Sequence, residues 1–474
     1  MKKQLITIGI ISVCLLVLII VFELHSDTEE QGEDTQEILL ETKTEDIIWS
    51  NITNHKGGYH VTWKDGNAEV SQIEKLPIDE FKVRKFTENI SSFIVQKEIK
   101  EGIERLADFG LDEPKAKVEL KIKDKKNITL SIGDRVPEAE GNSRYVSLGN
   151  GVYVMDEDRV ESFFYGTCDF ISDEVSPSYE EVAQGENTAL VTKVRIKKEK
   201  EEPLVISLLG SEKMAGYLVN SYQITSPIYY PASADITEEF LITFFDIKST
   251  EVVSVNATEE EYKKYGLTVP YIEAEVEYQD ANADKRTFVL KASGSNEKGE
   301  VYMQRDDDPI IYKCKSETLS WLNTDVETLI TKEILVPDIR TISELTIKTN
   351  EKVYKIQLKN IGEENEEVSC NGKTLDVDSF RNLYYMLISQ SATEVIFDEM
   401  PDVDELERKA EVIYTYTDEN KKEDDLIFYK ESVRKLCAIL NSGERGYRLS
   451  SAGLETFLAN LEKFSSGEKI EAQY

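Results

Sequence analysis

The chain has 474 residues, of which 40% are hydrophobic and 31% are charged, a composition typical of globular proteins rather than of long disordered chains. Its net charge of −35 argues against nucleic acid as a partner, because phosphates need Lys and Arg for neutralisation. The same charge argues against a surface that lies on an anionic membrane. The length suggests about three domains.

The N-terminus has the pattern of a membrane anchor. Paired lysines precede an uncharged apolar run from Leu5 to Phe22, which is near the shortest length that crosses a bilayer core of roughly 30 Å. The residues after Phe22 lack the small side chains of a signal-cleavage site, and the residue before Cys14 is too large for a lipoprotein signal. We therefore expect an uncleaved transmembrane helix within residues 1–25, with a cytoplasmic N-terminus and an extracytoplasmic remainder.

Residues 26–45 are polar and acidic, which predicts a flexible stalk. Beyond the stalk, the same order of elements recurs three times, at residues 46–170, 188–330 and 340–465, before a tail at 466–474.

Each unit begins with a strand pair and an amphipathic helix. The apolar residues of the three expected helices are Val83, Phe86, Ile90, Phe93 and Ile94 in the first unit, Phe240 and Phe244 in the second, and Phe380, Leu383, Tyr384, Leu387 and Ile388 in the third.

The second half of each unit is predicted to be a strand meander closed by a short helix. The expected strands are 118–122, 128–132 and 152–154 in the first unit, 274–276, 288–290 and 311–312 in the second, and 412–414, 426–428 and 446–448 in the third. The last strand carries a tyrosine each time, namely Tyr153, Tyr312 and Tyr447. Closing helices are expected at 156–164, 316–322 and 450–461. The predicted class is therefore α+β: repeated antiparallel-sheet modules, each with two helices, preceded by one transmembrane helix.

The first two units share a connecting turn made of an aromatic residue, a glycine, a leucine and a proline. Its residues are Phe109, Gly110, Leu111 and Pro114 in the first unit and Tyr265, Gly266, Leu267 and Pro270 in the second. Glycine permits a positive φ, and proline fixes the entry into the next strand. The third unit has Met400-Pro401 near this place but lacks the aromatic-Gly-Leu sequence, so we interpret it as a divergent copy.

The string from Leu106 to Pro114, the ending Ile132-Gly133-Asp134 and the strand Val152-Tyr153-Val154 resemble a bacterial family called domain of unknown function 4340. The likeness is clearest from Pro77 to Phe164, and the second unit repeats it more weakly. The resemblance implies an N-terminal transmembrane helix and a role beside ABC-type export systems similar to those of the gliding-motility type. It implies no established enzymatic activity and transfers no catalytic residues.

Motifs of catalytic chemistry occur without their partner motifs. Asp108-Phe109-Gly110 spells the magnesium-binding tripeptide of protein kinases, but the glycine-rich loop, strand lysine and H-R-D motif are missing from the sequence. The sequence also has no Walker A motif and no G-x-G-x-x-G. Ser432-x-x-Lys435 and Ser466-x-x-Lys469 match a penicillin-binding spacing but lack S-D-N and K-T-G.

The histidines, cysteines and acidic loops also give weak signals. The three histidines are expected to be membrane-adjacent or exposed on a hairpin: His25, His55 and His60. The four cysteines after the anchor are widely spaced, which favours buried thiols over zinc or disulfides: Cys168, Cys314, Cys370 and Cys437. The acidic loops at 280–284 and 305–308 remain possible weak cation sites. In the first of them, Lys285 stands where a calcium-binding loop has a glycine.

The sequence therefore favours a non-enzymatic, membrane-anchored interaction protein with no catalytic residue, no cofactor and no metal. ABC permease or ATPase subunits are the partners that the resemblance implies. A binder of cell-envelope polymer is the alternative, since strand tyrosines can stack on sugars. A hydrolase with an unrecognised carboxylate site is the third reading.

Overall fold

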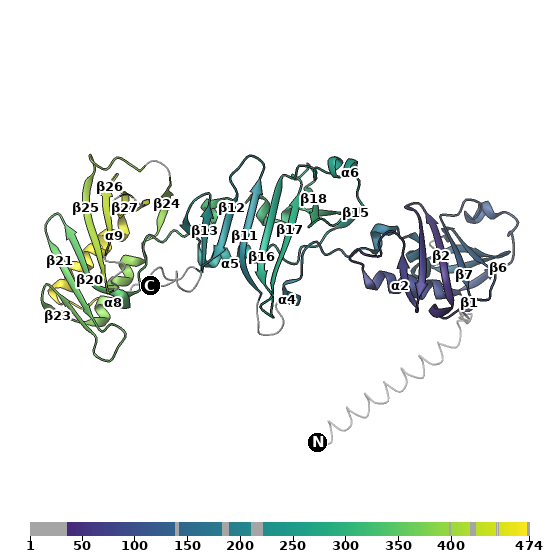
Figure 1. Ribbon diagram of the computed structural model, residues 1–474, viewed down its shortest axis with the longest axis horizontal. Helices are drawn as coiled ribbons and strands as arrows, with labels where there is room; N and C mark the ends of the chain where they lie inside the picture. Colours follow the sequence, from purple (N-terminus) through teal and green to yellow (C-terminus); the bar gives the residue numbers. More distant parts are fainter. Residues whose placement is uncertain are drawn as a thin grey trace, which may run out of the picture. The chain divides into compact units, whose positions relative to one another are not determined.

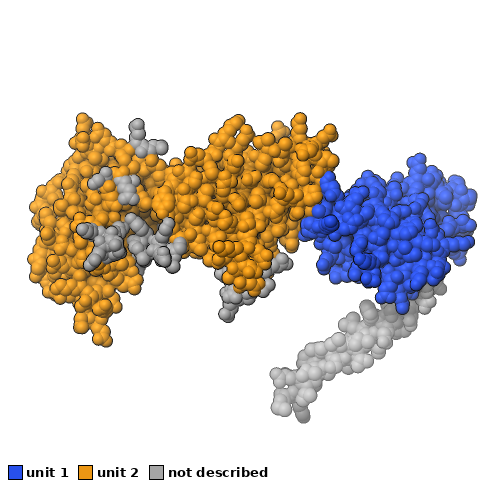
Figure 2. Space-filling model, viewed as in Figure 1, with its two compact units in different colours: residues 1–172, 254–256 blue, residues 173–253, 257–474 orange. Residues whose placement is uncertain are grey.

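The computed structural model describes residues 36–137, 142–182, 189–209, 221–397, 400–417, 423–441, 443 and 445–471. The chain divides into two compact units, residues 1–172 with 254–256 and residues 173–253 with 257–474 (Figure 2). The expected membrane anchor at residues 1–25 lies outside the described residues. Within the described residues, none of the helices has both the length and the apolar character that a membrane span requires.

The segment expected as a stalk contains a strand. β1 (Glu37–Glu41) pairs antiparallel with β5 (Ser92–Val95), and a short helix, η1 (Thr44–Asp46), follows it. Leu40 in β1 is 9% exposed. The expectation of a flexible stalk is therefore wrong for residues 37–41, because the apolar centre of Glu-Ile-Leu-Leu-Glu packs although its flanks are acidic.

The first module contains an eight-stranded antiparallel sheet in the order β4-β3-β2-β7-β8-β9-β10-β6 (Figure 1). Its strands are β2 (Ile47–Asn54), β3 (Gly57–Lys64), β4 (Asn67–Val70), β6 (Lys97–Ile99), β7 (Ala116–Ile122), β8 (Ile128–Arg135), β9 (Ser143–Leu148) and β10 (Gly151–Asp156). Its helices are α2 (Glu80–Ser91), η2 (Leu106–Phe109), α3 (Glu157–Val160), η4 (Glu161–Phe164) and η5 (Thr167–Phe170).

The core of the first module lies between α2 and one face of this sheet. Asp79 caps α2 by accepting a hydrogen bond from the backbone N–H of Lys82 at 3.1 Å. Phe86 of α2 is fully buried, and its ring meets that of Phe170 edge-on at 5.6 Å. The helix ends at Ser91, so Phe93, which we expected on the helix, is instead buried in β5.

The second module has a nine-stranded antiparallel sheet in the order β14-β13-β12-β11-β16-β17-β18-β19-β15. Its strands are β11 (Leu190–Lys198), β12 (Leu204–Leu208), β13 (Tyr222–Ser226), β14 (Tyr230–Pro231), β15 (Glu251–Val255), β16 (Ile272–Gln279), β17 (Lys285–Ala292), β18 (Glu300–Arg305) and β19 (Ile310–Lys315). Its helices are α4 (Tyr179–Val182), α5 (Ala234–Ile242), α6 (Glu259–Lys264), η6 (Ser316–Thr318), η7 (Ser320–Asn323) and α7 (Val326–Leu329).

The third module repeats this plan with the order β23-β22-β21-β20-β25-β26-β27-β28-β24. Its strands are β20 (Ile342–Thr349), β21 (Val353–Lys359), β22 (Glu367–Cys370), β23 (Lys373–Leu375), β24 (Ala392–Ile396), β25 (Glu407–Tyr416), β26 (Glu423–Lys430), β27 (Lys435–Leu440) and β28 (Arg445–Ser450). Its helices are η8 (Ile339–Thr341), α8 (Val377–Ile388) and α9 (Ser451–Ser466).

Strand register shows that the three sheets are copies of one design. Tyr153 of β10 lies opposite Val146, Tyr312 of β19 lies opposite Met303, and Tyr447 of β28 lies opposite Ala438. These tyrosines therefore occupy the same place in three sheets whose strands follow one order, with β14 and β23 as an added edge strand in the second and third sheets. This confirms the internal repeats expected from the sequence.

The predicted α+β class is wrong, because the chain is mostly β. The sheets themselves are antiparallel, as the sequence predicted. Each meander has a strand that the sequence analysis missed, namely β9, β18 and β27. The closing helices expected at 156–164 and 316–322 are present, but each is divided into two short helices of three or four residues, α3 with η4 and η6 with η7. Their apolar residues, such as Phe163 and Trp321, are fully buried.

Candidate functional site

The connecting turn of the first module packs tightly against β8 and β9. Gly110 has a φ of 64°, in the left-handed region, and a Cβ there would lie 2.5 Å from the Asp134 side chain. Phe109 meets Tyr145 edge-on at 5.0 Å, and Leu111 is 6% exposed. The turn residues thus fix the loop to the sheet.

The second copy of the turn has the same geometry, and its aromatic partner is equivalent, because Tyr302 precedes Met303 as Tyr145 precedes Val146. Gly266 has a φ of 72°, Leu267 is 4% exposed, and Tyr265 packs on Tyr302 with ring centroids 4.5 Å apart. Pro270 precedes β16 as Pro114 precedes β7. The third module has a different turn before the equivalent strand, β25. The Leu406 N–H donates a hydrogen bond to the Val403 carbonyl in this turn. The sequence-predicted residues therefore belong to two separate turns with structural roles.

Pro114 also borders the cavity that we consider the candidate site. This first-module cavity has a volume of about 770 Å³ and lies where β2, β7 and β9 meet the end of η4. Its charged and aromatic lining comes from His55, Lys115, Lys117, Arg144 and Phe164. Of the described residues that line it, none is acidic, although the chain carries 91 Asp and Glu against 56 Lys and Arg.

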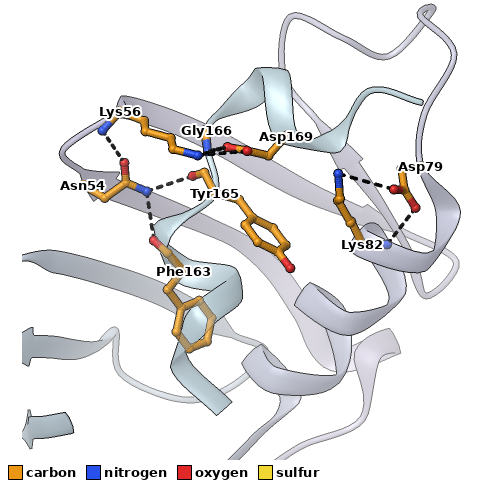
Figure 3. A network of polar contacts seen from close by, with 8 residues as sticks. All are labelled: Asn54, Lys56, Asp79, Lys82, Phe163, Tyr165, Gly166 and Asp169. Atoms are coloured by element: carbon orange, nitrogen blue, oxygen red, sulfur yellow. Dashed lines mark hydrogen bonds and ion pairs between the residues drawn. The ribbon is translucent and has the colours of Figure 1, made fainter. Parts of the chain in front are cut away.

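Asn54 holds the wall of the cavity in place. Its side-chain amide donates to the carbonyl of Phe163 at 2.9 Å and to that of Tyr165 at 2.8 Å, as Figure 3 shows. These two carbonyls flank Phe164, so one side chain fixes the residue between them. The same amide accepts from the Lys56 N–H at 2.8 Å.

A second polar contact closes the same loop (Figure 3). The Lys56 ammonium pairs with Asp169 at 2.7 Å, and Asp169 also accepts from the Gly166 N–H at 2.7 Å. The loop after η4 is therefore tied to the β2–β3 hairpin at several points.

Arg144 is the most enclosed cation of the cavity. Its side chain is 15% exposed, and its guanidinium carbon lies 4.6 Å from the centroid of the Phe164 ring. Its Nε donates to Glu157 at 2.9 Å, and Nη1 donates to the Gly133 carbonyl at 3.2 Å. A Cβ on Gly133 would overlap the Phe109 carbonyl oxygen. Gly133 therefore has two roles: its carbonyl accepts the hydrogen bond from Arg144, and its lack of a side chain leaves room for the turn.

The two lysines of the cavity are more exposed. Lys115 lies 3.5 Å from Asp134, and Lys117 donates to Glu119 at 2.8 Å. The hydrogen bond from Lys117, followed by one from Asn51, lowers the pKa of Glu119. Such exposed ion pairs contribute about 0–1 kcal/mol, so the lysines can exchange partners readily.

The family model described as "Domain of unknown function (DUF4340)" matches residues 35–210 and 223–407. The chain belongs to this family. The two matches cover the first module, the second module and the first part of the third, in agreement with the internal repetition. No curated protein shows significant similarity to this DUF4340 chain.

The other candidate residues of this DUF4340 chain do not form a second site. His55 lines the first-module cavity and faces Phe164 with ring centroids 6.3 Å apart, whereas a ring nitrogen of His60 lies 2.7 Å from the Asn51 amide oxygen. His25 lies outside the described residues. The Ser432 N–H bonds to the Lys435 carbonyl in a turn between β26 and β27.

The acidic loops and the cysteines hold no cluster of metal ligands. Among the described residues, no group of three or more His, Cys, Asp or Glu side chains is placed to hold a metal. Asp280 instead accepts from the backbone of its own loop and from Arg286 at 3.1 Å. Burial raises the pKa of the Cys314 thiol to about 12 and that of Cys437 to about 11.

Sequence reasoning missed the cavity because its parts are distant along the chain. Asn54 and the carbonyl of Tyr165 are separated by 111 positions. Of the residues that line it, the sequence had singled out Pro114 as part of the turn and His55 as an exposed hairpin residue, and neither pointed to a cavity.

Proposed function

We propose that the chain is a non-enzymatic, membrane-anchored extracytoplasmic interaction protein, and that it serves as an accessory component of an ABC-type transport or envelope complex. The apolar run from Leu5 to Phe22 after paired lysines supports the anchor and its orientation. The resemblance of the turn and strand motifs supports the class of partner.

The observation that carries this proposal is the repeated two-faced sheet. In β16, Ile272, Ala274, Val276 and Tyr278 are buried on the side of the core, while the residues between them are half-buried. β7 and β25 alternate in the same way. We call the side opposite the core the outer face, and its side chains are available for contact with another protein.

Copurification tests the proposal. We expect tagged full-length protein, extracted in mild detergent from its native membrane, to bring down an ABC permease and ATPase. Replacing residues 5–22 by an unrelated membrane helix, or removing the rest of the chain, should each abolish this recovery. Recovery of the protein alone would contradict the accessory role.

Binding of an envelope polymer is the second candidate, and the outer face of the first module favours it. Trp49 lies there beside His60, with ring centroids 6.1 Å apart, and Asn51 and Glu119 adjoin them. An aromatic ring among hydrogen-bonding side chains suits a sugar ring. We expect the protein to sediment with purified cell wall and Trp49→Ala to lose this association. Full retention by the variant would remove this candidate.

A further inference from the structure

We propose that the first-module cavity is an anion site that takes a phosphate group, either free or carried on an extracytoplasmic polymer. The inference concerns the first module alone, so it stands or falls independently of the membrane partner proposed above.

The charged side chains that line the cavity are basic, although the chain as a whole is acidic. Lys115, Lys117 and Arg144, with His55 beside them, line one space of about 770 Å³ in a protein of net charge −35. Several cations around one space suit an anion with more than one charge and several acceptor oxygens, which describes phosphate better than a single carboxylate.

The two other modules show that the fold does not require these cations. Asn54 pairs with Ala116, Lys198 with Ile272, and Thr349 with Ala410, so these three pairs are equivalent. One residue further along the second strand of each pair, the first module has Lys117, where the others have Glu273 and Glu411. The same sheet position therefore accepts either sign of charge.

The position of Arg144 in β9 also shows that the fold does not require a cation there. Val146 pairs with Ile132 as Met303 pairs with Ala292 and Ala438 with Phe428. Arg144, Val301 and Leu436 each lie two residues before these equivalent positions, so they are equivalent to one another. Val301 and Leu436 are 0% and 2% exposed. An arginine replaces a buried aliphatic residue only in the first module, where Phe164 and Glu157 hold it in position.

The cavity is prepared for a ligand without a large rearrangement. Asn54 fixes the carbonyls on both sides of Phe164, and Gly133 fixes one guanidinium nitrogen of Arg144. Lys115 and Lys117 are paired only with exposed carboxylates, so an anion can draw their ammonium groups into the cavity. A fixed arginine with adjustable lysines provides both geometry and charge.

Calorimetric titration of the full-length protein in neutral detergent tests this inference. One arm uses inorganic phosphate and the other uses a glycerol-phosphate oligomer. Saturable binding of phosphate would indicate a free anion as the natural ligand. Binding of the oligomer at least tenfold tighter per phosphate would indicate a polymer.

Variants decide whether the cavity is responsible. Lys117→Glu, which installs the residue of the other modules, should weaken binding at least tenfold, and Arg144→Leu should do the same. Lys121→Glu is the control, because it makes the same charge change on the same strand and face, where its ammonium bonds to the Lys125 carbonyl. Thermal unfolding of each variant checks that the first module remains folded.

Two results would overturn the inference. One is the absence of saturable heat with both probes. The other is an equal loss of binding in Lys121→Glu and Lys117→Glu, which would indicate general attraction to the surface. Because Lys117 is half-exposed, its variant keeps the test valid if Arg144→Leu fails to fold.

Discussion

The carbonyl oxygen of Phe109 occupies the space that a side chain on residue 133 would need, so the turn touches β8 only because that residue is Gly133. The contact joins the connecting turn to the sheet, and the same glycine accepts a hydrogen bond from Arg144. The turn motif and the cavity are therefore parts of one local structure.

Gly133→Ala should destabilise the first module by about 3 kcal/mol, because the added Cβ forces the turn away from β8. Urea unfolding followed by tryptophan fluorescence measures the change, with Trp49 and Trp63 reporting on this module. Gly58→Ala is the control, since its Cβ would lie 3.5 Å from the nearest atom. Equal stability of Gly133→Ala and the parent would contradict the tight contact.

Asn54→Ala should cost about 2 kcal/mol, because two carbonyls lose their donor in a half-buried loop. Hydrogen exchange should also become faster in residues 163–169, whose position depends on this side chain. Asn67→Ala on β4, at an exposed asparagine, should leave both readouts unchanged. Unchanged exchange in Asn54→Ala would show that other contacts hold the loop.

Asp376 should make the third module sensitive to acid. Hydrogen bonds from the Ser379 hydroxyl at 2.7 Å and then from its N–H at 2.8 Å lower the pKa of Asp376 below its ordinary value of 3.8. A lowered folded-state pKa adds stability that is complete above the ordinary value and is lost as the pH falls through the folded value.

Asp376→Ala should therefore destabilise the protein by about 1 kcal/mol at pH 7, as expected for loss of a helix cap. The difference should shrink as the pH falls below 3.8, as measured by thermal unfolding over a pH series. Asp376→Asn keeps a capping side chain and should remove most of the pH dependence. A difference that stays constant down to the lowest pH would contradict this role.

The buried thiols should resist alkylation. Cys314 and Cys437 are fully buried, and burial raises the pKa of both groups, so thiolate is scarce at pH 8. Iodoacetamide should modify Cys168, which is only half-buried, before either of them, as mass spectrometry of digested protein would show. Labelling of Cys314 in native protein at the rate seen in urea would contradict the structure.

The sequence predicted best where one face of an element is apolar. The spacing of Phe380, Leu383, Tyr384 and Leu387 indicated α8, and all four are buried. The connecting turns were also predictable, because glycine permits a positive φ and the following proline fixes the entry into the strand. Their glycines do have positive φ.

The missed elements share a physical cause. β9, β18 and β27 include charged or small residues, so their alternation is weak, and their pairing with neighbouring strands determines them. β1 looks like part of an acidic linker until Leu40 packs. The cavity needs residues from β2, β7, β9 and η4, and their meeting depends on the whole fold.

Photo-crosslinking in living cells tests the central claim, that the outer faces bind a membrane partner. A photoreactive amino acid would replace Lys121, Glu277 or Thr415, which occupy equivalent places in β7, β16 and β25 by register. The control position is Tyr385 of α8, which is 58% exposed. We expect at least one outer-face position, and not Tyr385, to yield a crosslink to an ABC permease or ATPase. Crosslinks to no protein from any outer-face position, or equal crosslinking from Tyr385, would contradict the account.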